Sequence, residues 1–211
     1  RPNPTSIINL FNVFKAKGKN DFAFQTIQKG RSILKNSYPL NFQFAEYYGA
    51  IKETKKMIQE YLSLIDYNSG YMEPIQNLLT RVIDFNNTTS EDYNLLKAEL
   101  LQRAQSKPND ANATEMVTWF FIQSRDFNAA LIQEQALDKR MNFSGGRVYD
   151  LGIICIENND YTTARKAFTY VKNLGQDKPL FYQAENAMLN TRYKEITTLR
   201  NLSASDINET V

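Results

Sequence analysis

The feature that most constrains the fold is a pattern that occurs twice, 34 residues apart, between residues 111 and 179. The step from Phe127 to Tyr161 is 34 residues (161 − 127), and the step from Ala130 to Ala164 is the same (164 − 130). Further apolar positions repeat with this step: Val117 and Leu151, Phe121 and Cys155, Leu137 and Val171. A fixed period of this size is typical of stacked repeats, in which each unit is a helix pair that cannot bury its apolar face alone. The sequence therefore predicts an all-α chain of helix pairs.

Composition argues against several classes of function. The 211 residues include 25 Lys plus Arg and 23 Asp plus Glu, a net charge of +2, with no block of like charge. Such a chain lacks the field that would hold nucleic acid or an anionic membrane surface. No run of eighteen apolar residues occurs, so we expect no membrane insertion. There is no histidine, which removes the usual general base and the commonest neutral metal ligand, and we expect no enzyme, metal or cofactor.

Two kinds of reactive residue have simpler structural explanations. The single cysteine, Cys155, lies in the apolar run 151–156 and is predicted to be a small core residue rather than a nucleophile. Four aspartates could suggest a catalytic carboxylate pair: Asp66, Asp84, Asp126 and Asp160. However, Asp126 and Asp160 recur at the repeat turns and Asp84 lies near another turn. We therefore predict that they cap helices and accept turn hydrogen bonds.

The 34-residue frame divides residues 1–211, taken as a single repeat domain, into five helix pairs and a partial sixth. The predicted pairs are about 4–37, 38–71, 72–110, 111–144 and 145–178, with a partial pair at 179–202. The third pair fits only if its interhelix loop holds about five extra residues, which is tolerated because loop-closure entropy grows slowly with length.

The two ends of the chain deviate from the frame. Thr5 or Ser6 is expected to cap the first helix. In the partial sixth pair we expect a second helix from Lys194 to Leu202, followed by a frayed end at 203–211. The sequence opens on Arg1 rather than Met, which suggests a processed or truncated piece, and we expect it to be a segment of a longer array.

The best copy of the repeat matches a known signature at five places: Val148, Leu151-Gly152, Tyr161, Ala164 and Phe168. The preceding copy matches at Val117, Phe121, Phe127 and Ala130. In this pattern the chain resembles the tetratricopeptide repeat family, strongly from 93 to 171 and weakly elsewhere. It departs from the family at Thr118, where glycine is usual, at Glu134, where an aromatic is usual, and at Asn142, where proline is usual. The resemblance implies a degenerate, bacterial TPR-like protein with a right-handed α-α superhelix of about five to six helix pairs.

The resemblance also implies a binding surface, because the first helices of such pairs line a concave groove. Transferred position by position, the groove candidates are Asn12, Lys15, Phe42, Glu46, Gln76, Thr80, Glu115, Trp119, Gln123, Tyr149, Ile153 and Glu157. Trp119 and Tyr149 are the leading ones, since Trp and Tyr are enriched in binding hot spots. For Trp119, however, a role in the core is favoured over a role as a ligand platform, because it lies in the apolar run 117–122. The charged clamp with which one subset of the family holds a chaperone tail is absent.

The function expected from this resemblance is a non-enzymatic scaffold that binds a protein, as a peptide or a partner helix, in the groove. The alternative is an envelope-associated repeat protein that binds a glycan or another ligand, with Trp119, Tyr149 and Phe181 stacking on sugar rings. A helical enzyme is disfavoured by the lack of histidine and of a Gly-rich phosphate loop. The compartment is left open, with the periplasm or envelope favoured over the cytoplasm.

Overall fold

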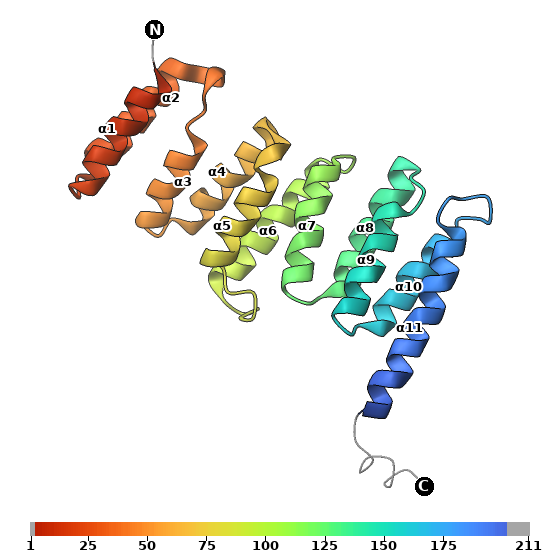
Figure 1. Ribbon diagram of the computed structural model, residues 1–211. Helices are drawn as coiled ribbons and strands as arrows, with labels where there is room; N and C mark the ends of the chain where they lie inside the picture. The colour runs from red at the N-terminus through yellow and green to blue at the C-terminus, as the bar shows by residue number, and fades with distance from the viewer. Residues whose placement is uncertain (1–2, 202–211) are drawn as a thin grey trace. The chain divides into compact units, whose positions relative to one another are not determined.

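The computed structural model describes residues 3–201, and this part of the chain is helical with no strand (Figure 1). The eleven α-helices are α1 (Pro4–Ala16), α2 (Asn20–Leu34), α3 (Asn41–Ala50), α4 (Thr54–Tyr67), α5 (Met72–Val82), α6 (Glu91–Ser106), α7 (Ala111–Gln123), α8 (Phe127–Met141), α9 (Gly146–Glu157), α10 (Tyr161–Lys172) and α11 (Phe181–Asn201). Two short 3-10 helices, Lys35–Ser37 and Ser69–Tyr71, lie between them. The all-α prediction is confirmed.

The chain divides into two compact units, Arg1–Gln102 and Arg103–Val211, and the division falls within α6. In unit 1, α1 packs on α2 and α3 packs on α4. In unit 2, α7 packs on α8, α9 packs on α10, and α10 also contacts α11. Adjacent helices therefore form packed pairs, as the repeat predicts. The expectation of a single domain stays a prediction.

The turns within four of the predicted pairs have the same backbone conformation. Each is three residues long and has a left-handed residue in the middle: Gly18 (φ 66°), Lys52 (φ 60°), Arg125 (φ 58°) and Asn159 (φ 62°). The next residue donates its N–H to the carbonyl five residues earlier: Lys19 to Phe14, Glu53 to Tyr48, Asp126 to Phe121 and Asp160 to Cys155, over 2.8–2.9 Å. This is the Schellman arrangement, which satisfies carbonyls at a helix end. It recurs with the sequence period in each unit (52 − 18 and 159 − 125 are both 34).

The connection between α5 and α6 differs in length. It runs from Ile83 to Ser90, eight residues against three at the other turns, so it is five residues longer (8 − 3). The predicted insertion is confirmed in place and in size. Asp84 stabilises the loop by accepting the Asn86 N–H at 3.0 Å, and the Ser90 hydroxyl accepts the Tyr93 N–H at 3.2 Å at the start of α6.

Helix caps follow the prediction in unit 2 but not at the first helix. Asp126 accepts the N–H of Ala129 at 3.0 Å and Asp160 accepts that of Thr163 at 2.9 Å, which confirms both as caps. The cap of α1 is Asn3, whose side chain accepts the Thr5 N–H at 2.9 Å. The prediction of Thr5 or Ser6 was wrong because Pro4, with its fixed φ and missing N–H, is suited to the first helical position.

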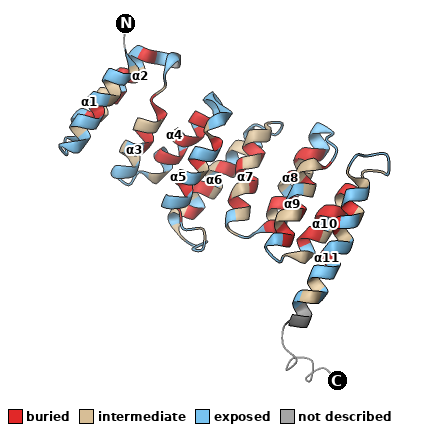
Figure 2. Ribbon diagram, in the orientation of Figure 1, coloured by how far each residue is buried: buried red, intermediate tan, exposed pale blue. Residues whose placement is uncertain are grey.

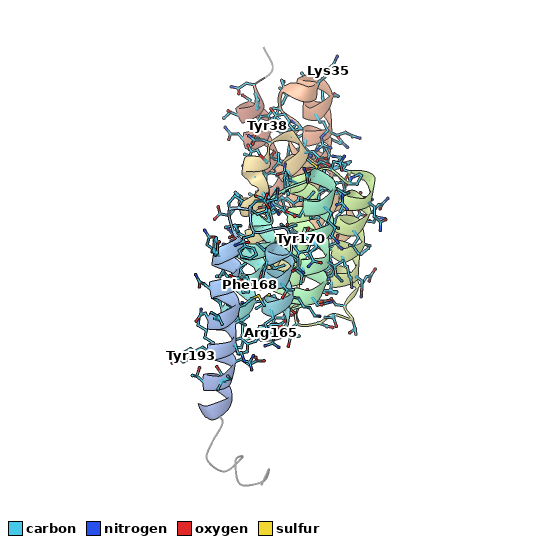
Figure 3. The ribbon with its side chains drawn as sticks, turned by 90° about the vertical axis from the view of Figure 1, so that its right-hand side faces the viewer. Lys35, Tyr38, Arg165, Phe168, Tyr170 and Tyr193 are labelled. Carbon is cyan, nitrogen blue, oxygen red and sulfur yellow. The ribbon has the colours of Figure 1, made fainter. Side chains whose placement is uncertain are left out.

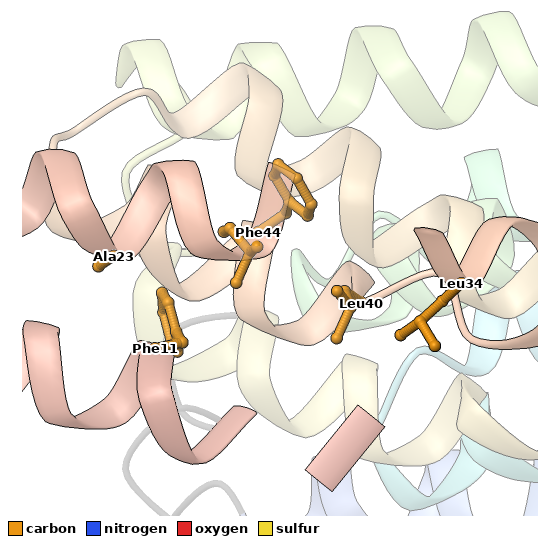
Figure 4. Close-up of a cluster of buried hydrophobic side chains, with 6 residues drawn as sticks. Phe11, Ala23, Leu34, Leu40 and Phe44 are labelled. Atoms are coloured by element: carbon orange, nitrogen blue, oxygen red, sulfur yellow. The ribbon is translucent and has the colours of Figure 1, made fainter. Parts of the chain in front are cut away.

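The core of unit 1 begins with a cluster between its first helices (Figure 4). Its buried members are Phe11, Ala23, Ile27, Leu34, Leu40 and Phe44. A polar clamp lies beside it: Arg31 of α2 forms two hydrogen bonds with the carboxylate of Glu60 of α4, at 2.8 and 2.6 Å. Asn41 donates to the same carboxylate at 2.7 Å, and the Arg31 guanidinium lies 3.5 Å from the centroid of the Phe44 ring. The clamp thus joins α2, α3 and α4.

Unit 2 buries the residues that carry the repeat (Figure 2). Val117, Phe121, Phe127, Ala130, Leu137, Leu151, Cys155, Ala164 and Val171 are all buried, whereas Tyr161 is half-buried. Gly152 is also buried, and a Cβ added there would lie 2.6 Å from the Phe168 ring. The small residue therefore lets the Phe168 ring of α10 lie directly against α9. Burial of Cys155 confirms its predicted core role and raises the pKa of its thiol to about 12.

The last described element corrects one expectation. α11 is one continuous helix, where two short helices with the second from Lys194 were expected. Nothing in the sequence from Phe181 to Asn201 stops the helix, since this stretch contains neither glycine nor proline. The frayed end expected at 203–211 lies outside the described residues.

Candidate functional site

A pocket of about 270 Å³ lies within unit 2 between α7 and α9, and we call it the α7–α9 pocket. Its lining residues are Glu115, Thr118, Ile122, Glu134, Arg147, Asp150, Leu151 and Ile154. All but Glu134 come from α7 and α9, whereas Glu134 reaches the pocket from α8. The pocket therefore combines apolar walls, made by Ile122, Leu151 and Ile154, with charged side chains.

Glu134 lies at the centre of the pocket's hydrogen-bond network. Its side chain is only 3% exposed. The Thr118 hydroxyl donates to one carboxylate oxygen at 2.7 Å, and the Arg147 guanidinium donates to both oxygens, Nε to Oε2 at 2.7 Å and Nη2 to Oε1 at 2.9 Å. The remaining Arg147 nitrogen, Nη1, donates to Glu115 at 3.2 Å. The hydrogen bonds to Glu134 raise the pKa of Arg147 above its ordinary value, so its positive charge is fixed.

The pocket lies where the chain departs from the repeat signature. Thr118 and Glu134 occupy the positions of Gly152 and Phe168 in the next pair (118 + 34 and 134 + 34). In that pair, the Phe168 ring packs directly on Gly152. In the α7–α8 pair, a hydroxyl and a carboxylate meet instead, and Arg147 from the following helix completes the contact. Sequence reasoning recorded the two departures separately and missed that they form a hydrogen-bonded pair.

A second polar contact in unit 2 holds the segment that carries Arg147. Asp138 of α8 is buried and accepts the Gly145 N–H at 2.9 Å and the Tyr170 hydroxyl at 2.9 Å. Burial, and then the bond to Asp138, raise the pKa of Tyr170. Gly145 has φ 80° and precedes α9, so it allows the sharp turn from α8 into this helix. Figure 3 labels Tyr170 beside Phe168 on α10.

The charges of the pocket do not balance. Three carboxylates line it, those of Glu115, Glu134 and Asp150, against the single guanidinium of Arg147, which leaves two negative charges (3 − 1). Glu134 is enclosed, whereas Glu115 and Asp150 remain accessible at the rim. A cationic group is the ligand that this imbalance favours.

The sequence-predicted site residues lie on several helices, and the structure brings only one of them into the pocket. That residue is Glu115.

Phe42 contacts the rings of Tyr61 and Tyr71, at centroid distances of 6.3 and 5.5 Å, and Glu46 pairs with Lys15. Tyr149 packs edge-on against Phe168 with centroids 5.4 Å apart. Gln76, Trp119 and Ile153 are half-buried, and Asn12, Thr80, Gln123 and Glu157 are exposed. Their role in a groove stays a prediction.

Unit 1 has a different kind of hollow. A depression of about 390 Å³ on α1 and α2 is lined mainly by apolar groups, among them Leu10, Phe14, Phe22 and Ile33. None of the sequence-predicted residues lines it.

Within residues 3–201, no group of acidic or cysteine side chains is arranged to hold a metal ion. No helix in this range is both long and apolar enough to cross a bilayer. No protein-family model matches the chain, and no curated protein matches its sequence. The pocket and the helix pairs are therefore the features of the molecule that bear on its function.

Proposed function

We propose that the chain is a non-enzymatic protein-interaction scaffold that binds a peptide or a partner helix across α7 and α9. The observation that carries this proposal is the α7–α9 pocket, with apolar walls and an excess of carboxylates. The proposal includes the finer architecture that the repeat implies, a right-handed superhelix of the tetratricopeptide type. The 34-residue recurrence of the Schellman turns within each unit supports that architecture.

The pocket is suited to a lysine or arginine side chain of the partner. The aliphatic part of such a side chain packs along Ile122, Leu151 and Ile154, while its charged end reaches Glu115 and Asp150 at the rim. The Glu134 carboxylate needs no hydrogen bond from the ligand, because Thr118 and Arg147 already donate hydrogen bonds to it. This network keeps the base of the pocket in place whether or not a partner is bound.

Peptide selection on the intact chain tests this proposal. We would select a library of random peptides displayed on phage, then measure the affinity of the best synthetic peptide by fluorescence anisotropy. The expected result is enrichment of a basic residue next to apolar ones. The double variant Glu115→Gln, Asp150→Asn should weaken binding at least about tenfold, because it removes both accessible carboxylates.

The control is Asp177→Asn, which removes an exposed carboxylate of unit 2 that lies outside the pocket. It should change the affinity by less than about twofold, and circular dichroism should show that every variant is folded. Enriched peptides without a basic residue, unchanged binding by the double variant, or no enriched peptide would each overturn the proposal.

The glycan-binding alternative finds less support in the aromatic residues. It needs open ring faces, but Tyr149 already contacts Phe168 and Phe181 contacts Tyr182, with centroids 5.2 Å apart. We therefore give the peptide proposal precedence. Binding of an oligosaccharide array by the wild type, together with loss in Tyr149→Ala, would favour the alternative.

A further inference from the structure

An exposed apolar stripe runs along α11. It consists of Tyr182, Leu189, Tyr193 and Ile196, whose exposed fractions are 59%, 70%, 68% and 42%. At about 100° per residue, these four side chains fall within a sector of about 60° on the helix surface. Scattered exposed apolar residues are ordinary on protein surfaces, but a continuous stripe of this kind marks an interaction surface.

The stripe lies on the side of α11 that faces away from the rest of unit 2. The buried residues Ala184, Ala187 and Thr191 lie on the opposite side of the helix, and α11 packs on α10. Figure 3 shows Tyr193 on the other side of α11 from Arg165 of α10, which pairs with Glu195. The stripe is therefore free to meet a second surface without disturbing the packing of unit 2.

The charged residues beside the stripe indicate which partner surface would fit it. Glu185 and Arg192 flank the stripe on one side, while the other side carries the uncharged Asn186 and Asn190. If two α11 helices pack antiparallel with the two-fold axis at Leu189, side chains on the same flank face each other. Glu185 then lies beside Arg192 of the second copy, with an offset of one residue along the helix axis. The two-fold symmetry creates this pair twice.

Under the same symmetry, apolar residues of the stripe lie opposite apolar residues of the stripe in the second copy. Tyr182 lies opposite Ile196 of the second copy (182 + 196 = 2 × 189), and Leu189 meets its own equivalent. A parallel arrangement instead places the charged flank against the uncharged one, so that Glu185 and Arg192 gain no partner from the second copy; within its own chain Glu185 contacts Lys172 of α10 at 3.1 Å. We propose that two copies of this chain associate through α11 as an antiparallel, two-fold symmetric helix pair. This inference does not depend on the α7–α9 pocket.

The first experiment is sedimentation equilibrium of the intact chain over a range of concentrations. We expect a reversible rise from the 24.4 kDa of one chain to twice that mass. Leu189→Glu should raise the dissociation constant of the dimer at least about tenfold, because it buries a charge on the axis. Leu189 is the most exposed residue of the stripe, so the substitution leaves the monomer folded, as circular dichroism will verify.

A matched control is Ile132→Glu. Ile132 is an exposed apolar residue on α8, 55% accessible and away from the stripe, and its substitution should leave the dissociation constant unchanged. A wild-type chain that stays monomeric at every concentration would overturn the proposal. So would a dimer that withstands Leu189→Glu, because another surface would then hold it.

Charge reversal tests the antiparallel register. Glu185→Arg alone places two pairs of positive charges across the axis, and Arg192→Glu alone places two pairs of negative charges there. Each variant should therefore dimerise at least about tenfold more weakly than the wild type. An equimolar mixture of the two should regain the wild-type dissociation constant, since both pairs across the heterodimer are then opposite in sign. Failure of the mixture to associate better than either variant would contradict the proposed arrangement.

Discussion

Glu134 and Phe168 occupy equivalent positions, 34 residues apart, in neighbouring helix pairs of unit 2. Phe168 is fully buried against Gly152, so it contributes through apolar contact. Glu134 is equally enclosed, and its charge is costly there unless it is paired and hydrogen-bonded. Thr118 and Arg147 supply those partners. The stability of this region should therefore depend on Thr118, Glu134 and Arg147 together, because removal of one charged partner leaves the charge of the other unpaired.

Glu134→Ala should lower the free energy of unfolding by about 1–3 kcal/mol, since it leaves the half-buried Arg147 guanidinium with Glu115 alone. Urea unfolding followed by circular dichroism measures this. In a double-mutant cycle with Arg147→Ala, the two losses should add to more than the loss in the double variant. Additive losses would show that the two side chains do not act together.

Cys155 gives a prediction for the pH dependence of stability. Burial raises the pKa of its thiol from the ordinary 9.0 to about 12. Above about pH 9 the unfolded chain loses this proton while the folded chain keeps it. The free energy of unfolding should therefore fall as pH rises from 9 towards 12, by at most about 1.4 kcal/mol per pH unit.

The test compares urea unfolding of the wild type and of Cys155→Ala between about pH 8 and about pH 10.5. The decline with pH should be smaller in the variant. Tyr61 and Tyr170, whose pKa values are also raised, are present in both proteins and cancel in the comparison. Parallel declines would mean that Cys155 is not protected from ionisation.

At the scale of helices, the three-residue turns and the close contact of α9 with α10 set the geometry of a pair. Sequence periodicity predicted the turns well because their spacing depends on local chain geometry, and the five-residue insertion before α6 could be counted directly. The periodicity was wrong at α11, where the 34-residue frame predicts a turn before Lys194 but the sequence contains no residue that would end the helix. It also misplaced the cap of α1, since Asn3 and Thr5 are both good capping residues and only the position of Pro4 separates them.

Gly152→Ala should destabilise the protein by about 1–3 kcal/mol, because the added Cβ meets three atoms of the Phe168 ring at 2.6–3.1 Å. Gly146 in the same helix offers a control, since a Cβ there meets nothing within 4 Å. Gly146→Ala should be neutral or slightly stabilising. Thermal unfolding of the two variants side by side measures the difference, and equal midpoints would contradict this account of the α9–α10 contact.

Arg125→Gly should stabilise the protein by up to about 1 kcal/mol. Arg125 holds φ 58° at the turn between α7 and α8, a conformation that costs a residue with a Cβ about 1–2 kcal/mol. Part of that gain is offset by the greater freedom of glycine in the unfolded chain. The opposite change at the equivalent turn, Gly18→Ala, should destabilise. If both variants lower the unfolding midpoint, the side chain of Arg125 is needed for another reason.

At the scale of the molecule, the two compact units raise the question of how they unfold. Helix-pair proteins gain most of their stability from contacts between nearest neighbours, so regions distant in the sequence can respond separately. The α7–α9 pocket belongs wholly to unit 2. Its position could not have been predicted from the period alone, because it depends on which helix Glu134 reaches and on Arg147 coming from the next pair. Of the lining residues, Thr118 and Glu134 were noted in advance only as departures from the repeat signature, and Glu115 alone was named as a binding candidate, through the family frame.

The single tryptophan makes separate unfolding measurable. Trp119 lies in unit 2, so its fluorescence reports on that unit, while far-ultraviolet circular dichroism reports on all helices. Phe11→Ala, which opens the core of unit 1 at a cost of about 3–5 kcal/mol, should shift the dichroism transition and leave the fluorescence midpoint in place. Phe168→Ala should shift the fluorescence midpoint. Identical shifts of both signals in Phe11→Ala would show that the units unfold together.

The long connection before α6 has a practical consequence. Its eight residues are five more than in each of the other four turns within the predicted pairs, yet helices of regular length precede and follow it. Asn86, Asn87, Thr88 and Thr89 are all exposed. This is therefore a suitable place to graft foreign sequence, such as an affinity tag or a fluorescent reporter domain, since the protein already accommodates extra length there.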